Sequence, residues 1–327
     1  MKKISKRILC MVMIAATLLM CSCGDKENDE EVRIGSLKGP TTIGLIALME
    51  KSDAQETGNA YSFTMETQSD VLLTMMMQGE LDIALVPANV AAVLYNKTQG
   101  GICVIDINTL GVLYLVSKDT AITGITDLSG RTIYLTGKGT TPDYVLRYLL
   151  EENGISTEDV TLEYKSEATE VAAILAENPD AIGLLPQPFA TAVTQQNSEL
   201  SIVADLSAEW DATQKTDGSM MVTGVTIVRR EFLEANEELV KQFLQDHMAS
   251  AEMVETDVTS TAAGAVQYGI MEKEAIAQLA IPYCNVVYMD GTAMQNALSG
   301  YLNVLFAEDP TSVGGSLPAE DFYYLSE

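Results

Sequence analysis

The chain has 327 residues, and 47 % of them are hydrophobic, which is enough to bury a large core in one or two lobes. It carries 46 acidic residues against 19 basic ones, a formal net charge of −27. Binding to nucleic acid needs the opposite sign, so this composition excludes DNA and RNA as partners. A small anionic ligand is not excluded, because screening over about 8 Å lets nearby groups outweigh distant charge.

The first residues predict a targeting segment. Four basic residues precede an apolar run from Ile8 to Met20, which is too short to span a bilayer and fits the core of a signal peptide. The run ends in Met20-Cys-Ser-Cys-Gly24, which resembles a bacterial lipoprotein signal. We therefore expect residues 1–22 to be removed and Cys23 to be lipidated, with Cys21 as the alternative acceptor. A plain secretory peptide with incidental cysteines is the other interpretation.

Cleavage at this point predicts an extracytoplasmic protein held at the bacterial membrane by its lipid anchor. Residues 23–31 form a charged stretch that we expect to act as a flexible tether. Acyl chains contribute about 0.8 kcal/mol per buried CH₂, so two or more on one cysteine hold a protein at a membrane. Besides Cys23, the remaining chain has Cys103 and Cys284, each in or beside a strand-like run. We expect buried free thiols in preference to a disulfide.

From residue 32 the apolar pattern alternates between strand and helix. Strands are expected at residues 32–37, 61–67, 81–86, 101–107, 110–117, 132–135, 160–164, 181–185, 222–228 and 285–288. Helices are expected at residues 43–49, 71–78, 90–95, after Thr141, at 170–176, after Pro188, at 231–254 and through most of the remainder. Continuous apolar strands between amphipathic helices predict an α/β fold with largely parallel sheets covered on both faces.

One loop stands out because it lies between a predicted strand and a predicted helix. Thr136-Gly-Lys-Gly-Thr-Thr141 precedes Pro142, which suits the first turn of a helix, and Thr141 is a good N-cap. Free backbone N–H groups and the positive end of a helix dipole, with Lys138 beside them, can hold a small anion or polar ligand. An ordinary turn between strand and helix is the alternative.

Five short motifs extend the interpretation over residues 32–325. They are Ile34-Gly-Ser-Leu-Lys-Gly-Pro40, Gly79-Glu-Leu-Asp-Ile-Ala84, Asp127-Leu-Ser-Gly-Arg-Thr-Ile133, Leu150-Glu-Glu-Asn-Gly-Ile155 and Val228-Arg-Arg-Glu-Phe-Leu233. In this order, and behind a lipoprotein signal, the chain resembles the two-lobed solute-binding proteins of bacterial ABC importers. The resemblance is to the branch that serves nitrate, sulfonates, taurine and thiamine-precursor pyrimidines.

The resemblance implies a type II periplasmic-binding-protein fold, in which each lobe is a mostly parallel sheet flanked by helices and two hinge strands join the lobes. We place the crossings near residues 110–115 and 223–228. Lobe 1 is then residues 32–112 plus 229–327, and lobe 2 is residues 113–228. The resemblance also implies a small-molecule ligand, a monomer, and permease subunits in the membrane as partners, with no cofactor and no metal.

In sheets of this kind, ligands bind beyond the carboxyl ends of the strands. Six polar turns follow predicted strands, and we expect them to face one cleft. Their candidate ligand-binding residues are Lys38, Thr41, Thr42, Gln68, Asn89, Lys138, Thr140, Thr141, Glu167 and Gln187. Cations and an acid in one cleft suit a small organic anion or a zwitterion, sulfonate-like or pyrimidine- or amino-acid-like. The single tryptophan, Trp210, lies in an acidic segment that we expect to be peripheral.

An enzyme on the same fold is the main alternative, and a sensory ectodomain that binds a ligand for a membrane partner is the second. The only histidine, His247, follows Val240, Phe243 and Leu244 at helical spacing, which predicts packing on the inner face of a helix. The sequence has no GxSxG or HExxH motif, and the loop around Lys138 lacks the spacing of a nucleotide-binding P-loop. We therefore expect a binding protein without enzymatic activity.

Overall fold

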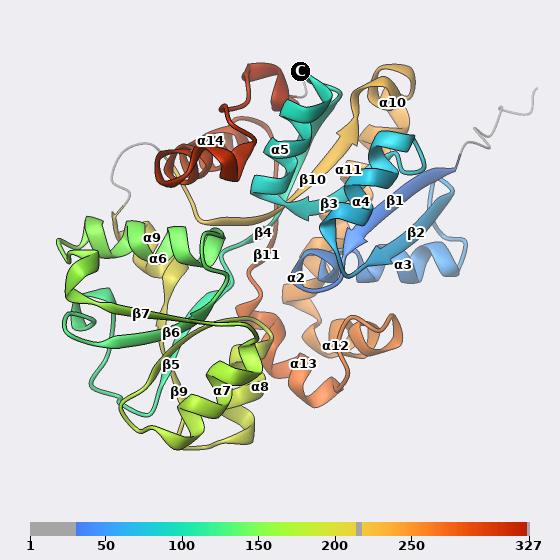
Figure 1. The fold of residues 1–327 in the computed structure, drawn as a ribbon. Coiled ribbons are helices and arrows are strands. Elements are labelled where there is room, and N and C mark those ends of the chain that lie inside the picture. The colour runs from blue at the N-terminus through green and yellow to red at the C-terminus, as the bar shows by residue number, and fades with distance from the viewer. Residues whose placement is uncertain (1–30, 214–217, 326–327) are drawn as a thin grey trace, which may run out of the picture. The chain divides into compact units, whose positions relative to one another are not determined.

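Two separate sheets organise the chain, and helices cover both faces of each (Figure 1). The computed structural model describes residues 31–213 and 218–325, and the predicted signal peptide and the lipidation site at Cys23 lie outside them. From Val32 onward the chain forms one compact unit. The strands are β1 (Val32–Leu37), β2 (Tyr61–Glu66), β3 (Ile83–Pro87), β4 (Ile102–Leu110), β5 (Leu113–Ser117), β6 (Thr132–Thr136), β7 (Thr161–Lys165), β8 (Ile182–Pro186), β9 (Ser201–Asp205), β10 (Val222–Arg229) and β11 (Val286–Met289).

The helices lie between these strands and in the last third of the chain. They are α2 (Pro40–Ile43), α3 (Ile46–Asp53), α4 (Ser69–Gln78), α5 (Ala88–Thr98), α6 (Thr141–Glu152), α7 (Ala168–Glu177), α8 (Phe189–Gln196), α9 (Leu206–Thr213), α10 (Arg230–Ala235), α11 (Glu237–Thr256), α12 (Val258–Gln267), α13 (Glu274–Ala280) and α14 (Gly291–Glu308). No helix in the described ranges combines the length and apolar character that crossing a bilayer requires.

The α/β fold with two sheets is confirmed: most strands of each sheet run in one direction, with β10 and β11 reversed in the first sheet and β5 reversed in the second. The first sheet has the order β11-β4-β10-β3-β1-β2, and the second has the order β7-β6-β8-β5-β9. β1 is parallel to β2 and β3, whereas β10 is antiparallel to β3 and β4. In the second sheet β6 is parallel to β7 and β8, and β5 is antiparallel to β8 and β9. A chain that crosses between sheets and later returns adds strands in both directions.

The chain crosses between the sheets twice. The first crossing is short, because β4 ends at Leu110 in the first sheet and β5 begins at Leu113 in the second. The return lies between α9 and β10. The expected boundary at residue 228 would assign β10 to the second lobe. In the structure β10 pairs along its length with β3 and β4 of the first sheet. The lobe boundaries themselves, which concern what moves together, stay a prediction.

Alternate residues of the central strands face opposite cores. In β3, Ala84 and Val86 pack with residues of α4, α5 and α14, while Ile83 and Leu85 pack with residues of α3 and α11. In the second sheet, Leu115 faces the core shared with α6 and α9, and Tyr114 faces the core shared with α7 and α8. Each sheet is therefore buried on both faces, as continuous apolar strands predict.

Two expectations about the C-terminal half are wrong. Residues 231–254 do not form one helix, because Asn236 leaves helical geometry (φ −135°, ψ 43°) between α10 and α11. Trp210 is not peripheral but fully buried. Its ring centroid lies 4.6 Å from that of Tyr148 and 5.6 Å from that of Tyr301, so α9 turns this face inward and its acidic neighbours outward.

The remaining differences are smaller. β9 and α9 fall in a stretch where no element was expected. The strand-like run at residues 285–288 is confirmed as β11, which pairs with β4. Cys103 and Cys284 are buried free thiols, as expected, and burial raises the pKa of each to about 12. His247 is fully buried on α11, as its spacing predicts.

Candidate functional site

The loop after β6 has the expected path, but its own residues satisfy its polar groups. Gly137 and Gly139 have positive φ values of 79° and 68°, which residues with a side chain rarely adopt. The hydroxyl of Thr140 donates to the carbonyl of Gly137 at 2.5 Å, and the N–H of Gly139 donates to Asp143 Oδ2 at 2.9 Å. α6 begins at Thr141, so the N-cap is Thr140, one residue before the expected Thr141.

Asp143 is the centre of a buried polar cluster behind this loop. Its Oδ1 accepts hydrogen bonds from Arg147 Nε at 2.6 Å and from the Tyr164 hydroxyl at 2.7 Å. The Tyr144 hydroxyl donates to the carbonyl of Gly139 and to Asp309, and burial, reinforced by these carboxylates, raises the pKa of Tyr144 to about 12. The chain thus places its own carboxylate where an anionic ligand was expected.

A cavity of about 330 Å³ opens beside this loop and is lined from both sheets. We call it the first cavity. Its apolar lining comes from the end of β3, the first turn of α5, the first crossing, α6 and β10, namely Pro87, Val90, Val112, Leu113, Pro142, Met221 and Val222. Its polar lining residues are Asn89, Thr140, Thr141, Thr223 and Tyr301. Two helix N-termini, those of α5 and α6, therefore meet at one cavity.

Three of the ten candidate residues line the first cavity: Asn89, Thr140 and Thr141. Lys138, from the same loop, is exposed, and its Nζ lies 5.3 Å from the centroid of the Tyr164 ring. Lys38 lies at a second cavity of about 460 Å³, between α8 and α13, together with Pro188 and Lys273. The structure therefore separates Lys38 from the loop residues with which it was grouped.

Four other candidates have no place in the lining of either cavity. The hydroxyls of Thr41 and Thr42 both donate to the carbonyl of Leu37 at 2.7 Å, which holds the turn into α2. Gln68 and Glu167 are exposed residues at the N-cap positions of α4 and α7, and neither side chain forms a capping hydrogen bond. Their geometry is that of turns which start helices.

Gln187, the last candidate, is buried next to the first crossing. Its N–H donates to the carbonyl of Val112 at 2.9 Å, and Val112 lines the first cavity. Its Oε1 accepts from the N–H of Thr191 at 3.3 Å. Gln187 Nε2 and Thr191 Oγ1 have no hydrogen-bond partner among the described residues. Buried polar atoms of this kind are rare, and they mark places that bound water or a ligand can complete.

The sequence interpretation missed a buried polar chain that links the strands flanking the crossings. His247 Nδ1 on α11 lies 3.1 Å from Asp106 Oδ2 on β4. The hydroxyl of Thr226 on β10 donates to Asp106 Oδ1 at 2.7 Å, and Asn108 Nδ2 donates to that hydroxyl at 3.1 Å. All four side chains are buried. Asp106 and Asn108 interrupt an otherwise apolar strand, which was the available signal.

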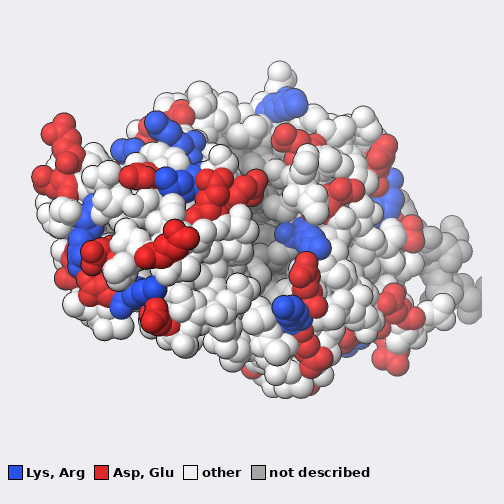
Figure 2. Space-filling model, turned by 60° about the horizontal axis from the view of Figure 1, so that its bottom comes forward, with Lys and Arg blue, Asp and Glu red and all other residues white. Residues whose placement is uncertain are grey.

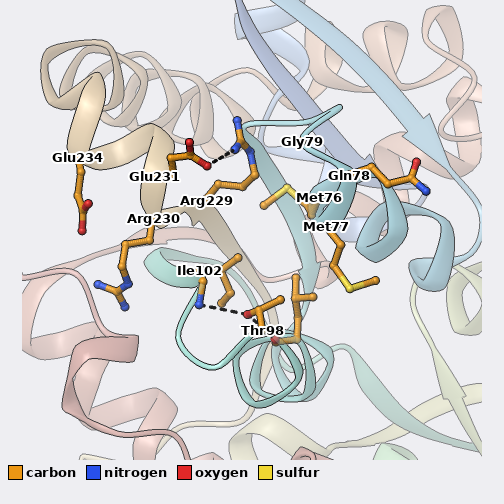
Figure 3. A pocket seen from close by; sticks show the side chains of 12 residues that line it. Met76, Met77, Gln78, Gly79, Thr98, Ile102, Arg229, Arg230, Glu231 and Glu234 are labelled. Atoms are coloured by element: carbon orange, nitrogen blue, oxygen red, sulfur yellow. Dashed lines mark hydrogen bonds and ion pairs between the residues drawn. The ribbon is translucent and has the colours of Figure 1, made fainter.

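A larger cavity, of about 510 Å³, lies at the opposite end of β3, where Gly79, Thr98 and Arg229 meet (Figure 3). Its cationic groups already have protein partners. Arg229 donates to the carbonyl of Leu81 and to Asp82, and Arg230 donates to the carbonyl of Gly100 and to Asp321. We therefore do not assign this cavity as the ligand site, although its volume is greater than that of the first cavity.

Charge is mixed over the surface. Figure 2 shows acidic and basic side chains interspersed on one face, with a hollow between them and no continuous basic patch on that face. Within residues 31–213 and 218–325, no cluster of three or more His, Cys, Asp or Glu side chains could hold a metal ion.

Comparison with solved structures identifies the fold. An ABC transporter structure from Parabacteroides distasonis is 24 % identical, with a TM-score of 0.75, and the match covers 91 % of this chain and all of the other. The sulphonate-binding protein SsuA of Escherichia coli matches at 13 % identity and a TM-score of 0.68, over 91 % of this chain and 94 % of its own. This is the periplasmic binding protein fold.

The same fold also occurs in other settings. The CA3427 product of Candida albicans, described as having the generic periplasmic binding protein fold, matches at 12 % identity and a TM-score of 0.53 over 89 % of this chain and 98 % of its own. The family model described as NMT1/THI5 like matches residues 100–256. No curated protein matches the sequence. The resemblance to two-lobed solute-binding proteins is thereby confirmed at the level of fold.

Proposed function

We propose that the chain is the solute-binding subunit of an ABC importer and captures a small solute between its two lobes. The observation that carries this proposal is the first cavity, which takes its lining from both sheets and from the crossing between them. A solute there contacts Asn89 on one side and Thr140 and Thr141 on the other. The comparisons support the proposal, since the similar structures include an ABC transporter and a sulphonate-binding protein.

Binding at this place couples solute capture to movement of the lobes. The two crossings join the sheets, and a solute that touches both sides stabilises the closed arrangement over the open one. Each helix N-terminus contributes roughly 0.3–1 kcal/mol toward a polar group, whereas micromolar affinity corresponds to about −8.2 kcal/mol. Apolar contacts with Val90, Leu113 and Met221 must therefore supply a large share of the affinity.

We propose a revised set of ligand-binding residues. Asn89, Thr140 and Thr141 contact the solute directly, and Gln187 acts from beside Val112. Lys38 belongs to the second cavity and serves the mouth of the cleft between α8 and α13. Thr41, Thr42, Gln68, Lys138 and Glu167 are left out of the set, because their contacts or their exposure give them structural roles.

The partners follow from the importer role. We propose that the protein is extracytoplasmic and monomeric, anchored through lipid on Cys23, and that it delivers its solute to permease subunits in the membrane. Cell fractionation tests the anchor. The unmodified chain and the Cys21→Ala variant are expected in the membrane fraction, and Cys23→Ala in the soluble one. Loss of membrane attachment in Cys21→Ala, with attachment kept in Cys23→Ala, would assign the lipid to Cys21.

Native mass spectrometry tests the binding function. Protein isolated from its own cells is expected to carry one small molecule per chain, which denaturation releases unchanged. The Asn89→Ala and Thr141→Val variants are expected to carry less of it. Chemical conversion of the bound molecule on long incubation would instead support an enzyme. His247, the only histidine, lines none of the cavities described above and offers little support for that alternative.

A further inference from the structure

The first cavity has a lining without formal charge. Of the described residues that form it, seven are apolar and the other five carry only hydroxyl or amide groups. The sequence predicted an anion or a zwitterion, because Lys38, Lys138 and the loop after β6 were expected to converge. In the structure Thr140 and Thr141 of this loop line the cavity, but neither Lys38 nor Lys138 does.

In the loop after β6, the groups that could hold an anion are engaged within the chain. The N–H of Gly139 donates to Asp143, and the N–H of Thr140 donates to the carbonyl of Gly137 at 3.0 Å. Pro142, in the first turn of α6, has no N–H to offer. Lys138 lies over the Tyr164 ring. An anion in the first cavity would meet the N-terminus of α6 with Asp143 already bound there, and like charges repel.

The nearby carboxylates that could hold a cation are also engaged within the chain. Asp143 is paired with Arg147, and Asp309 accepts from the N–H and the hydroxyl of Thr311 at 2.8 Å as well as from Tyr144. A charged group transferred from water into such a cavity without an opposite charge is strongly disfavoured. Hydroxyl and amide groups, by contrast, can pair with uncharged donors and acceptors of a solute.

We infer that the solute of the first cavity is uncharged: a compact molecule with an apolar body and a few hydroxyl, carbonyl or amide groups. This rests on the proposed function and narrows its ligand class. A volume of about 330 Å³ lies near the lower end of the range of roughly 300–1,000 Å³ for ligand pockets, which suits a small molecule and not a peptide. Asn89, Thr141 and Thr223 set the specificity by hydrogen bonding, and Val90 and Leu113 receive the apolar body.

Matched pairs of probes that differ in charge and little in shape test this inference. The pairs are benzamide with benzoate, benzenesulfonamide with benzenesulfonate, and ethanesulfonamide with ethanesulfonate. Each is titrated into the full chain in detergent solution, and binding is followed by calorimetry and by the thermal midpoint. In the pairs that bind, the uncharged member is expected to bind at least about tenfold more tightly than the anion.

A charge placed in the lining makes the test independent of any one probe. Val90→Lys puts a cation at the cavity on the first turn of α5, and it is expected to shift preference at least about tenfold toward the anionic member. Val71→Lys is the matched control, because Val71 is a 38 % exposed valine in the first turns of α4 and lines none of the described cavities. The control is expected to leave the preference unchanged. The circular dichroism spectra of both variants are expected to match that of the folded, unmodified chain.

The outcomes separate the inference from the proposed function. Tighter binding of the anionic members by the unmodified chain overturns the inference and leaves a solute-binding function standing. Equal response of Val90→Lys and Val71→Lys overturns it too, because the probes then bind elsewhere. Absence of binding by every probe, together with absence of any solute on protein from its own cells, contradicts the proposed function, and the inference falls with it.

Discussion

Asp143 accepts a hydrogen bond from the backbone N–H of Gly139, four residues earlier, at 2.9 Å. A carboxylate within the first turn of α6 thereby occupies the place that the glycine loop offers to an anion. The loop has the shape of an anion site, and the protein fills it from within. This contact explains why a strand, a glycine-rich loop and a helix can line a cavity without giving it preference for negative charge.

Removal of Asp143 is expected to destabilise the second sheet and its helices. Asp143→Ala leaves Tyr164 and Arg147 without their shared acceptor and frees the N–H of Gly139. Because Asp143 is 3 % exposed, the expected loss in free energy of unfolding is about 3 kcal/mol, measured by urea denaturation. The exposed Asp180→Ala serves as control, with a change below about 0.5 kcal/mol. Equal effects of the two would deny Asp143 this role.

The two halves of the loop after β6 are expected to differ in their effect on binding. Lys138→Ala removes only an exposed contact with the Tyr164 ring, so it should cost about 0.5 kcal/mol of stability and leave solute affinity within about twofold. Thr141→Val changes the cavity wall and is expected to weaken binding at least about tenfold. Calorimetric titration of both variants checks this. A larger loss in Lys138→Ala than in Thr141→Val would restore the lysine to the site.

A second buried carboxylate predicts a dependence of stability on pH. Burial opposes ionisation of Asp82, but hydrogen bonds from Arg33 and Arg229 outweigh it and lower the pKa of Asp82 below its ordinary value. A lowered folded-state pKa contributes stability that is complete above the unfolded pKa of about 4 and is lost as pH falls through the folded value. Asp82→Asn should therefore cost about 2 kcal/mol at pH 7 and progressively less below pH about 4.

Urea denaturation of Asp82→Asn and the unmodified chain from neutral to acid pH measures this difference. Asp180→Asn is the control, since Asp180 is exposed and its effect should be small at every pH. A difference between Asp82→Asn and the unmodified chain that stays constant down to acid pH would contradict the role of the arginine pair.

Trp210 provides a direct check on the packing of α9. Its ring lies against Tyr148 and Tyr301, and its Nε1 donates to Ser219 Oγ at 3.3 Å. We expect short-wavelength emission, weak quenching by acrylamide, and a loss of about 2 kcal/mol in Trp210→Phe. Since Tyr301 lines the first cavity, solute binding should also change the emission intensity. Emission typical of an exposed indole would contradict this arrangement.

The local parts of the fold could be predicted from the sequence, and the distant contacts could not. Thr141 and Pro142 placed the start of α6 within one residue, because capping and the proline ring act over a single turn. The burial of Trp210 depends on Tyr148 and Tyr301, which come from other helices. The acidic residues beside it in the sequence predicted an exposed position instead. The pair His247 and Asp106 is separated by 141 residues, and no local pattern reveals it.

In the candidate site, too, the local features could be predicted from the sequence and the distant contacts could not. The rule that ligands bind beyond the carboxyl ends of strands led to Asn89, Thr140 and Thr141, which do line one cavity. It could not tell which turns are used by the fold itself, as Thr41 and Thr42 are in holding the carbonyl of Leu37. An acidic residue in the first turn of α6 was visible in the sequence, and it could have indicated that the glycine loop supplies its own anion.

The affinity of the solute recovered from the protein, measured for one variant from each side of the first cavity, tests the central claim most directly. If one solute bridges the two lobes, Asn89→Ala and Thr141→Val each weaken its binding at least about tenfold, while Thr161→Val, an exposed substitution on β7, leaves it unchanged. Unchanged affinity in either Asn89→Ala or Thr141→Val would contradict capture between two lobes.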